Sequence, residues 1–446
     1  MEKNNLPLKI QILYGVGVSY AIVDQIFAQW VLYYYLPPSA SNLEALLPPV
    51  FISIALVVSR FVDMVFDPLI GHISDRIETK WGRRMPFIAI GSLPLALTTI
   101  AYFYPLKGET YLTFLHLMIV GCLFFIFYTI VGAPYNALIP ELASNKEDRL
   151  NLSTWQSVFR LLYTAIAMIS PGILIEVFGQ GNDEFGIRMM AISLSLLAML
   201  GSLVTVFSID ERRYSGGKTS NITLKKALYY ITQNKSFIYY LFGFMFFFLG
   251  FNTLRASINY YVEDIMGYTT AYITLASGLL FGMAALFFYP VNRLAQKIGY
   301  KKPMLISLVL LIILSLGLFG LDRLIPASYG FVIFALLGIP ISGAAFIFPP
   351  AMLSEISAVE SEKSGIQIEG IFFGIQGFFL KLAFLLSIAI LPIVLTFAAD
   401  GAIIEGMIHS PDNVARTGIY NTALVAIISF LLSFIFYFLY QEEKIE

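Results

Sequence analysis

The sequence predicts an all-α membrane protein whose twelve transmembrane helices form two six-helix bundles. One observation is composition: 58% of the 446 residues are hydrophobic and 13% are charged, whereas a soluble domain carries about 25% charged residues. The second is a series of apolar segments of about 20 residues or more, the length that crosses a bilayer as a helix. The third is a long polar interruption near the midpoint, which divides these segments into two sets of six.

The expected helices follow the apolar segments in chain order. They cover residues 9–35, 46–74, 86–105, 110–139, 155–178, 187–209, 236–262, 270–294, 303–321, 327–353, 368–397 and 416–440. The polar interruption, residues 210–235, is expected to be a cytoplasmic linker. It separates an N-terminal bundle, residues 1–209, from a C-terminal bundle, residues 236–446.

Basic residues predict the orientation of these helices. With both termini in the cytoplasm, the inner connections hold 20 of the 28 Lys and Arg residues, the outer connections hold 4 and the spans hold the other 4. Because basic residues gather on the cytoplasmic side, both termini are expected there. The chain is therefore expected to be a multi-pass protein of the cell (inner or plasma) membrane, monomeric in its lipid bilayer. Because its charges are divided between the two sides of the membrane, the net charge of −1 is uninformative about partners. The sequence has no pattern typical of nucleic-acid binding, so no nucleic-acid partner is expected.

Two short motifs recur in the second half of the chain. Residues 81–86 (Trp-Gly-Arg-Arg-Met-Pro) match residues 298–303, and residues 137–142 match residues 351–356. Both matches have an offset of about 215 residues, which two parallel repeats would give. The alternative is that Gly-basic-basic turns simply recur on cytoplasmic loops.

Three charged side chains interrupt the second predicted span. Arg60, Asp63 and Asp67 fall on one stripe of a helix. A carboxylate in hydrocarbon costs roughly 2.5 to 3.5 kcal/mol, so these groups should face a bundle interior and bind something. Two ionised carboxylates one turn apart repel each other, and Na⁺, Li⁺ or one proton would relieve that repulsion. The alternative is an Arg60–Asp63 salt bridge that only holds helices together.

Two motifs give the chain a family resemblance. One is Arg60-x-x-Asp63-x-x-x-Asp67-Pro68-x-x-Gly71 in the second span, and the other is Trp81-Gly82-Arg83-Arg84 in the connection that follows. With twelve spans in two halves, the chain resembles the major facilitator superfamily. More narrowly, it resembles the glycoside-pentoside-hexuronide:cation symporters. The resemblance covers nearly the whole chain and implies cation-coupled uptake of a small organic solute, a sugar or glycoside, by alternating access.

The resemblance also implies a cation site. The family's two helix-two aspartates match Asp63 and Asp67 position for position, and its threonine ligand is kept as Thr129. The expected coupling ion is Na⁺, Li⁺ or H⁺, and no other cofactor is expected. The family's helix-four aspartate aligns with Gly132 and a sugar-stacking tryptophan aligns with Asn136, so the sugar site departs from the family pattern.

Further polar stripes are expected to bind the substrate. Asp24 in the first span and Arg160 in the fifth are interpreted as displaced substitutes for family sugar ligands, with their mutual ion pair as the alternative. Lys381 aligns with a lysine that the family keeps in span eleven. The complete set of candidate substrate-binding residues is Asp24, Asn136, Arg160, Asn252, Arg255, Asn259, Gln376 and Lys381.

A charged group in the connection after the second span is expected to latch the two halves on the cytoplasmic side. It consists of Asp75, Arg76, Arg83 and Arg84. The alternative is a solvated cluster of the kind that cytoplasmic loops usually carry.

Two other functions are weighed against a sugar symporter. The sodium-dependent lysophosphatidylcholine symporters are also similar, in the segments 134–138, 344–346 and 371–373, and such a substrate would use Arg160 or Lys381 for its phosphate. An intramembrane enzyme could use paired acids with a metal. However, the chain has no His-Glu-x-x-His or Gly-x-Ser-x-Gly motif and its three histidines are scattered, so an enzyme is not expected.

Overall fold

A computed structural model describes residues 6–77, 79–143, 146–214, 234–364, 369–396 and 414–441. These ranges are predominantly helical, and eleven of their helices are long and apolar enough to cross a membrane. A further apolar helix, Met85–Ala101, has 17 residues and corresponds to the third predicted span. The prediction of an all-α membrane protein is therefore confirmed, with one span shorter than expected.

The chain divides into two compact units. Unit 1 consists of Met1–Pro37 and Ser41–Thr219, and unit 2 consists of Pro38–Ala40 and Ser220–Glu446. The division falls within the predicted linker, of which residues 215–233 lie outside the described ranges.

Unit 1 begins with a span of changing helical pitch, Leu8–Tyr35. This span is built from α1 (Leu8–Val16), the 3-10 turn η1 (Gly17–Tyr20), α2 (Ala21–Ile26), the π-helical η2 (Phe27–Val31) and α3 (Leu32–Tyr35). The other helices of unit 1 are α4 (Pro49–Arg76), α5 (Met85–Ala101), α6 (Thr110–Leu142), α7 (Lys146–Gly179), α8 (Asp183–Ser208) and α9 (Glu211–Tyr214).

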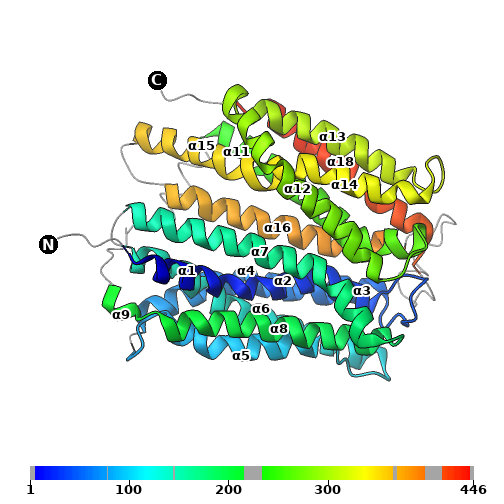
Figure 1. Cartoon of the computed structure of the whole chain (residues 1–446), viewed down its shortest axis with the longest axis horizontal. Coiled ribbons are helices and arrows are strands. Elements are labelled where there is room, and N and C mark those ends of the chain that lie inside the picture. The colour runs from blue at the N-terminus through cyan, green and yellow to red at the C-terminus, as the bar shows by residue number, and fades with distance from the viewer. Residues whose placement is uncertain are drawn as a thin grey trace. The chain divides into compact units, whose positions relative to one another are not determined.

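Small residues let the helices of unit 1 approach closely. Helix α4 packs on α6, α5 packs on α6 and α8, and α7 packs on α8 (Figure 1). Gly121 of α6 lies against Ser59 of α4, and Gly91 of α5 lies against Ile130 of α6. Helices in a membrane gain stability from such close packing because lipid gives them no hydrophobic drive to associate. The contact at Gly121 lies beside the charged stripe, because Ser59 directly precedes Arg60.

Unit 2 has the same kind of helical packing. Its elements are α11 (Lys235–Tyr260), the π-helical η3 (Tyr261–Ile265), α12 (Ala271–Ile298), α13 (Lys301–Phe319), η4 (Ala327–Tyr329), α14 (Gly330–Ile341), the π-helical η5 (Ser342–Ile347), α15 (Phe348–Ser364), α16 (Glu369–Leu395) and α18 (Arg416–Leu439). Helix α11 packs on α16 and α18, α12 packs on α14, and α13 packs on α18.

Two local conformations recur in the units. Gly82 has φ +107° directly before α5, and Gly299 has φ +83° directly before α13. Glycine adopts this left-handed region without the steric cost that a Cβ would bring. The first span of each unit also contains a π-helical turn near its C-terminal end, at η2 and at η3. These matches agree with the internal repeat that the sequence motifs predict.

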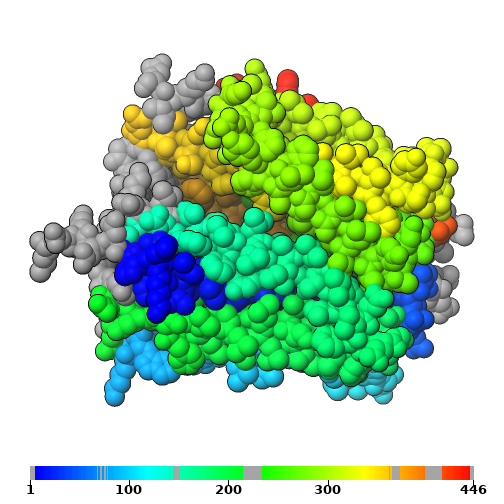
Figure 2. All heavy atoms as spheres, in the orientation of Figure 1, coloured from blue at the N-terminus to red at the C-terminus, as the bar shows by residue number. Residues whose placement is uncertain are grey.

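Apolar side chains cover the outside of the helices. Figure 2 shows α7 and α8 at the surface of unit 1, and these helices expose Leu161, Leu200 and Phe207 by 48%, 56% and 74%. Large exposed apolar surfaces mark contact with lipid or another apolar partner. Together with the apolar spans they indicate a multi-pass membrane protein.

We predict that Gly338→Ala destabilises unit 2. Gly338 of α14 lies against the backbone oxygen of Leu280 in α12, so an added Cβ would force the two helices apart. Overpacking of this kind costs about 1–3 kcal/mol and should lower the Tm in detergent. Gly282→Ala is the matched control, because a Cβ at Gly282 would enter open space. Equal Tm values for the two variants would contradict this packing.

Candidate functional site

Helix α4 carries three charged side chains on one face. Arg60, Asp63 and Asp67 are three and four residues apart, so they lie along one side of the helix. Arg60 and Asp63 are 4% and 1% exposed, and Asp67 is partly buried. The predicted stripe therefore points into unit 1, as the cost of a charge in lipid requires.

Thr129 of α6 joins the two carboxylates of this stripe. Its hydroxyl oxygen lies 3.1 Å from Asp63 Oδ1 and 3.1 Å from Asp67 Oδ1. A threonine hydroxyl has one proton to donate, so one proton serves two carboxylate oxygens. The three oxygen atoms converge, and carboxylate and hydroxyl oxygens are the ligands that hard cations prefer.

Arg60 lies between two acids. Its Nη1 atom is 3.5 Å from Asp24 Oδ1 and 3.5 Å from Asp63 Oδ2, longer than the roughly 2.7–2.9 Å of a strong charged hydrogen bond. The guanidinium also lies over the Phe125 ring, 4.7 Å from its centroid, where a cation–π attraction holds it. The alternative Arg60–Asp63 pair thus exists, but Arg60 divides its charge between two carboxylates.

Three carboxylates and two guanidinium groups lie in or beside this stripe. Arg60 lies 3.5 Å from Asp24 and from Asp63, Thr129 contacts Asp63 and Asp67, and Arg160 interacts electrostatically with Asp24. Carboxylates this close together repel each other when both are ionised.

A second polar group contains Asn136 of α6 and Arg160 of α7. The Tyr20 hydroxyl interacts with both side chains, and Gln156 Nε2 donates a hydrogen bond to Asn136 Oδ1 at 2.8 Å. Asn136 and Arg160 are exposed although both lie within membrane spans. Charged groups inside spans face a bundle interior or water rather than lipid. The 3.5 Å ion pair of Asp24 is with Arg60, not with Arg160.

Gly132 shows how the site departs from the family pattern. A Cβ at Gly132 would lie 3.1 Å from the Tyr20 ring, closer than side chains normally approach. A side chain at this position would therefore require the Tyr20 ring to shift by a few tenths of an ångström.

In unit 2 the predicted residues lie on α11 and α16. Asn252, Arg255 and Asn259 of α11 are 4%, 5% and 0% exposed, and Arg255 lies 5.9 Å from the centroid of the Phe384 ring. Both candidates on α16, Gln376 and Lys381, are partly buried. Gln376 Nε2 donates a hydrogen bond to the Tyr240 hydroxyl.

The predicted cytoplasmic latch is paired within unit 1. Arg84 donates hydrogen bonds to Ser74 Oγ at 2.5 Å and to Glu141 Oε1 at 2.8 Å, and Arg83 lies 3.5 Å from the same Glu141 oxygen. The side chains of Asp75 and Arg76 lie outside the described part of the chain. A latch between the two units therefore stays a prediction.

Glu211 completes this end of unit 1. It is 1% exposed, and its carboxylate accepts hydrogen bonds from the backbone N–H groups of Arg83, Arg84 and Met85 at 2.8–3.1 Å. These N–H groups begin α5, where a negative charge is favoured by the helix dipole and by unpaired donors. The polar linker is thus anchored to the connection between α4 and α5.

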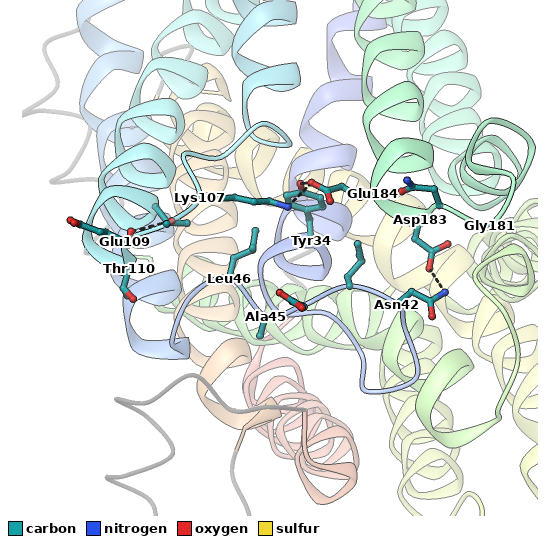
Figure 3. A pocket seen from close by; sticks show the side chains of 15 residues that line it. Tyr34, Asn42, Ala45, Leu46, Lys107, Glu109, Thr110, Gly181, Asp183 and Glu184 are labelled. Atoms are coloured by element: carbon teal, nitrogen blue, oxygen red, sulfur yellow. Dashed lines mark hydrogen bonds and ion pairs between the residues drawn. The ribbon is translucent and has the colours of Figure 1, made fainter.

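A cavity of about 730 Å³ opens at the other end of unit 1 (Figure 3). It lies among the connections that follow α3, α5 and α7. Lys107, Arg188 and Tyr34 all bind Glu184 Oε1, at 2.7, 2.6 and 3.1 Å. These charged side chains therefore already have partners in the protein. The residues that line the cavity do not include Arg60, Asp63 or Asp67 of α4.

Several residues of the site could not be identified from the sequence. Tyr20, Phe125 and Gln156 lie beside the charged groups. Aromatic residues are abundant in this chain and a single glutamine is not unusual, so no sequence pattern marks these three residues. Glu211 lies in a charged run that resembles a solvated linker. A usable signal existed only for Glu141, a carboxylate at the end of an apolar span within a recurring motif.

A family comparison identifies the relatives of this chain. The family model described as "MFS/sugar transport protein" matches residues 13–444. The lactose permease of Lactobacillus delbrueckii subsp. bulgaricus is 27% identical over 320 residues, covering 68% of this chain and 48% of that protein. The isoprimeverose transporter of Lactiplantibacillus pentosus is 25% identical over 396 residues, covering 87% and 80%. The inner membrane symporter YicJ of Escherichia coli is 27% identical over 221 residues, covering 48% and 45%.

The match thus spans about half the length of the lactose permease and of YicJ. Solved structures agree on the fold. A bacterial homologue of the lysosomal transporter Spinster, in an inward-facing conformation, has a TM-score of 0.68 at 13% identity, over 97% of this chain and 96% of that one. The nucleoside transporter NupG has a TM-score of 0.62 at 15% identity, over 97% of each chain.

We predict that Glu141→Gln stabilises the protein at high pH. Burial raises the pKa of Glu141 above its usual value of 4.5, and the neighbouring Glu211 adds to this, whereas Arg84 lowers it. The folded chain thus binds more protons here than the unfolded chain, so ionisation costs stability as pH rises through the raised pKa. The Tm of Glu141→Gln should exceed that of the wild type at pH 8, and the difference should vanish below pH 4.5.

The control for this measurement is Glu176→Gln, which removes a carboxylate from an exposed position. A lower Tm for Glu141→Gln than for the wild type at pH 8 would mean that the pairing of Glu141 with Arg84 outweighs the cost of burial.

Proposed function

The chain belongs to the MFS/sugar transport protein family, and on that premise we propose that it is a cation-coupled symporter of a sugar or glycoside. One observation carries the proposal. Asp63 and Asp67, in a membrane span, direct one oxygen each at the Thr129 hydroxyl at 3.1 Å. Such a pair is costly in an apolar unit unless a cation or proton binds to it.

The proposed cation step is electrostatic. Na⁺, Li⁺ or a proton binds to Asp63 and Asp67, with Thr129 as a further oxygen ligand, and relieves the repulsion between the two carboxylates. Arg60 contacts both Asp63 and Asp24 at 3.5 Å. A positive charge bound at Asp63 and Asp67 therefore changes the electrostatic potential at Asp24. Cation binding then favours the substrate-loaded state, and the ion gradient drives uptake.

The proposed substrate contacts lie beside the cation site and on unit 2. In unit 1, Asp24, Asn136 and Arg160 offer hydrogen-bond donors and acceptors to sugar hydroxyls, and Arg160 and Asn136 are exposed. In unit 2 the candidates are Asn252, Arg255, Asn259, Gln376 and Lys381. We propose that the two halves expose these groups alternately to the two sides of the membrane.

The finer architecture is part of the same proposal. It has twelve membrane-spanning helices, including the short α5, with both termini in the cytoplasm and with the protein acting as a monomer. The short α5 follows directly on a connection that Glu211 and Glu141 hold at the proposed cytoplasmic end. In the proposed cycle Asp75, Arg76, Arg83 and Arg84 serve as the latch at that end.

The relatives favour a sugar as the substrate class. Two of them are named for lactose and isoprimeverose transport, and both names describe a carrier of a hydroxyl-rich solute. The comparisons do not favour the lysophospholipid alternative, and the relatives are transporters rather than enzymes. A counterflow assay in proteoliposomes tests this directly, because a carrier exchanges labelled sugar without a gradient and forms no product.

We predict that Asp63→Asn abolishes cation-stimulated uptake. The variant removes one negative charge from the pair, so a cation has less to neutralise and loses an ionised ligand. Sugar uptake driven by a Na⁺ or proton gradient should fall to the level without a gradient, measured in proteoliposomes with protein content matched to the wild type. Undiminished stimulation by every cation would refute the site.

Thr129→Val tests the hydroxyl separately. It should raise the cation concentration needed for half-maximal stimulation by about tenfold, the equivalent of one lost interaction of roughly 1.4 kcal/mol. Thr99→Val is the matched control, since Thr99 is buried on α5 and donates a hydrogen bond to Leu95 O of its own helix, at 2.7 Å. Equal effects of the two variants would assign Thr129 a packing role.

A further inference from the structure

The connection between α4 and α5 contains a tightly hydrogen-bonded turn that exposes a tryptophan. Thr79 and Gly82 exchange both of their backbone hydrogen bonds, at 3.1 and 3.2 Å. The Thr79 hydroxyl also donates to Gly82 O at 2.9 Å and accepts from Trp81 N at 3.1 Å. These bonds fix the conformation of the turn, yet the Trp81 side chain within it is 59% exposed.

Helix α9 fastens this turn to the body of unit 1. Gly82 has φ +107°, and a Cβ at this position would collide with the Glu211 carboxylate. Arg212 Nη2 donates a hydrogen bond to Thr79 O at 2.6 Å. The turn and α9 thus lie together at one end of unit 1 (Figure 1). The position of the turn is therefore set by the fold.

The exposed tryptophan contributes little to the core of unit 1. Aromatic side chains stabilise a fold by burying a large apolar area, and most of the Trp81 side chain is left outside. Ile77, at the end of α4, is also exposed. Exposed apolar groups at a position that the fold holds fixed favour contact with another apolar phase.

Helix length and charge place the turn at the surface of the bilayer. In the proposed architecture α5 crosses the membrane, but its 17 residues span only about 25 Å, less than the roughly 30 Å of hydrocarbon. Residues 86–88 are apolar, whereas Arg84 and Glu211 directly beside the start of α5 are charged and avoid hydrocarbon. The boundary therefore falls at the start of α5. The turn lies at the headgroups, where tryptophan is enriched.

The charges near Trp81 favour an anionic lipid. Basic residues outnumber acidic ones among the exposed charged side chains that the structure describes in this connection and at α9, which are Lys80, Asp210, Arg212 and Arg213. Arg83 and Arg84 are directed at Glu141 instead. Each basic residue near a membrane surface strengthens binding to anionic lipid by about fivefold.

We propose that the Thr79–Gly82 turn is a binding site for the headgroup of an anionic phospholipid. Lys80 and Arg212 contact the phosphate, and the Trp81 ring lies at the level where the headgroup meets the acyl chains. The inference rests on α5 as a membrane span but is independent of the transported solute and of the coupling ion. Because Arg212 bonds to the turn, a bound lipid also holds the start of the polar linker at the membrane surface.

The first experiment measures the Tm in detergent with added phosphatidylglycerol, phosphatidylcholine or inorganic phosphate. Lys80→Gln removes the charge and Trp81→Ala removes the ring, and both side chains are exposed, so neither variant disturbs the core. Lys9→Gln is the matched control, because Lys9 is an exposed lysine on α1 of the same unit and lies outside the turn.

We expect phosphatidylglycerol to raise the wild-type Tm more than phosphatidylcholine does, and inorganic phosphate to leave it unchanged. Lys80→Gln should need about fivefold more phosphatidylglycerol for the same rise. Trp81→Ala should respond less to both phospholipids, since the ring meets the apolar part of either. Lys9→Gln should respond as the wild type does.

The second experiment measures the depth of Trp81 in vesicles of phosphatidylcholine and phosphatidylglycerol in equal parts. The Trp81 fluorescence is the difference between wild-type protein and Trp81→Phe. Lipids brominated at the headgroup end of the acyl chains should quench this fluorescence more strongly than lipids brominated at the methyl end.

Four results would overturn the inference. Equal Tm rises with the two phospholipids would exclude a preference for anionic lipid, and an equal rise with inorganic phosphate would indicate a site for free anions. Equal losses in Lys80→Gln and Lys9→Gln would indicate a diffuse effect of charge. Absence of quenching at either depth would mean that Trp81 faces water or another protein.

Discussion

The convergence of Asp63 and Asp67 on the single hydroxyl proton of Thr129 is the constraint on which the rest of the site depends. Both carboxylates lie in an apolar span, where placing a charge is costly. Arg60 lies 3.5 Å from Asp63 and equally far from Asp24, so its charge is shared between them. Buried charges of one sign raise the free energy of the folded state unless something of opposite charge binds. The arrangement is therefore suited to a monovalent cation or a proton.

The packing of unit 1 brings the charged residues of several helices into contact with one another. Gly121 allows α6 to approach α4 at Ser59, and the same pair of helices carries Thr129 and the aspartates. Arg60 then links Asp63 to Asp24, and Asp24 interacts with Arg160. In the proposed mechanism, a cation bound at the aspartates changes the electrostatic potential along this series of charges. The change reaches Arg160 and Asn136, where the substrate would bind. Coupling then requires no contact between the ion and the sugar.

Much of this could be predicted from sequence because membranes impose simple rules. The lengths of the apolar segments predicted the membrane-spanning helices. The spacing of Arg60, Asp63 and Asp67 predicted that they lie on one face of α4. The short α5 differed from its prediction because its apolar segment continues past Ala101, where the helix ends. Tertiary contacts were not predictable. The Tyr20 ring at Gly132, the Phe125 ring under Arg60 and the Glu211 carboxylate at the start of α5 all join residues far apart in sequence, and none of them has a local pattern.

The most direct test of the central claim is the cation dependence of the Tm of purified wild-type protein, without sugar, at constant ionic strength. A ligand that binds only the folded state raises stability with the logarithm of its concentration. The account predicts that replacing choline chloride with NaCl or LiCl raises the Tm, and that Asp67→Asn removes most of this rise. Equal Tm values in choline, sodium and lithium chloride would contradict it.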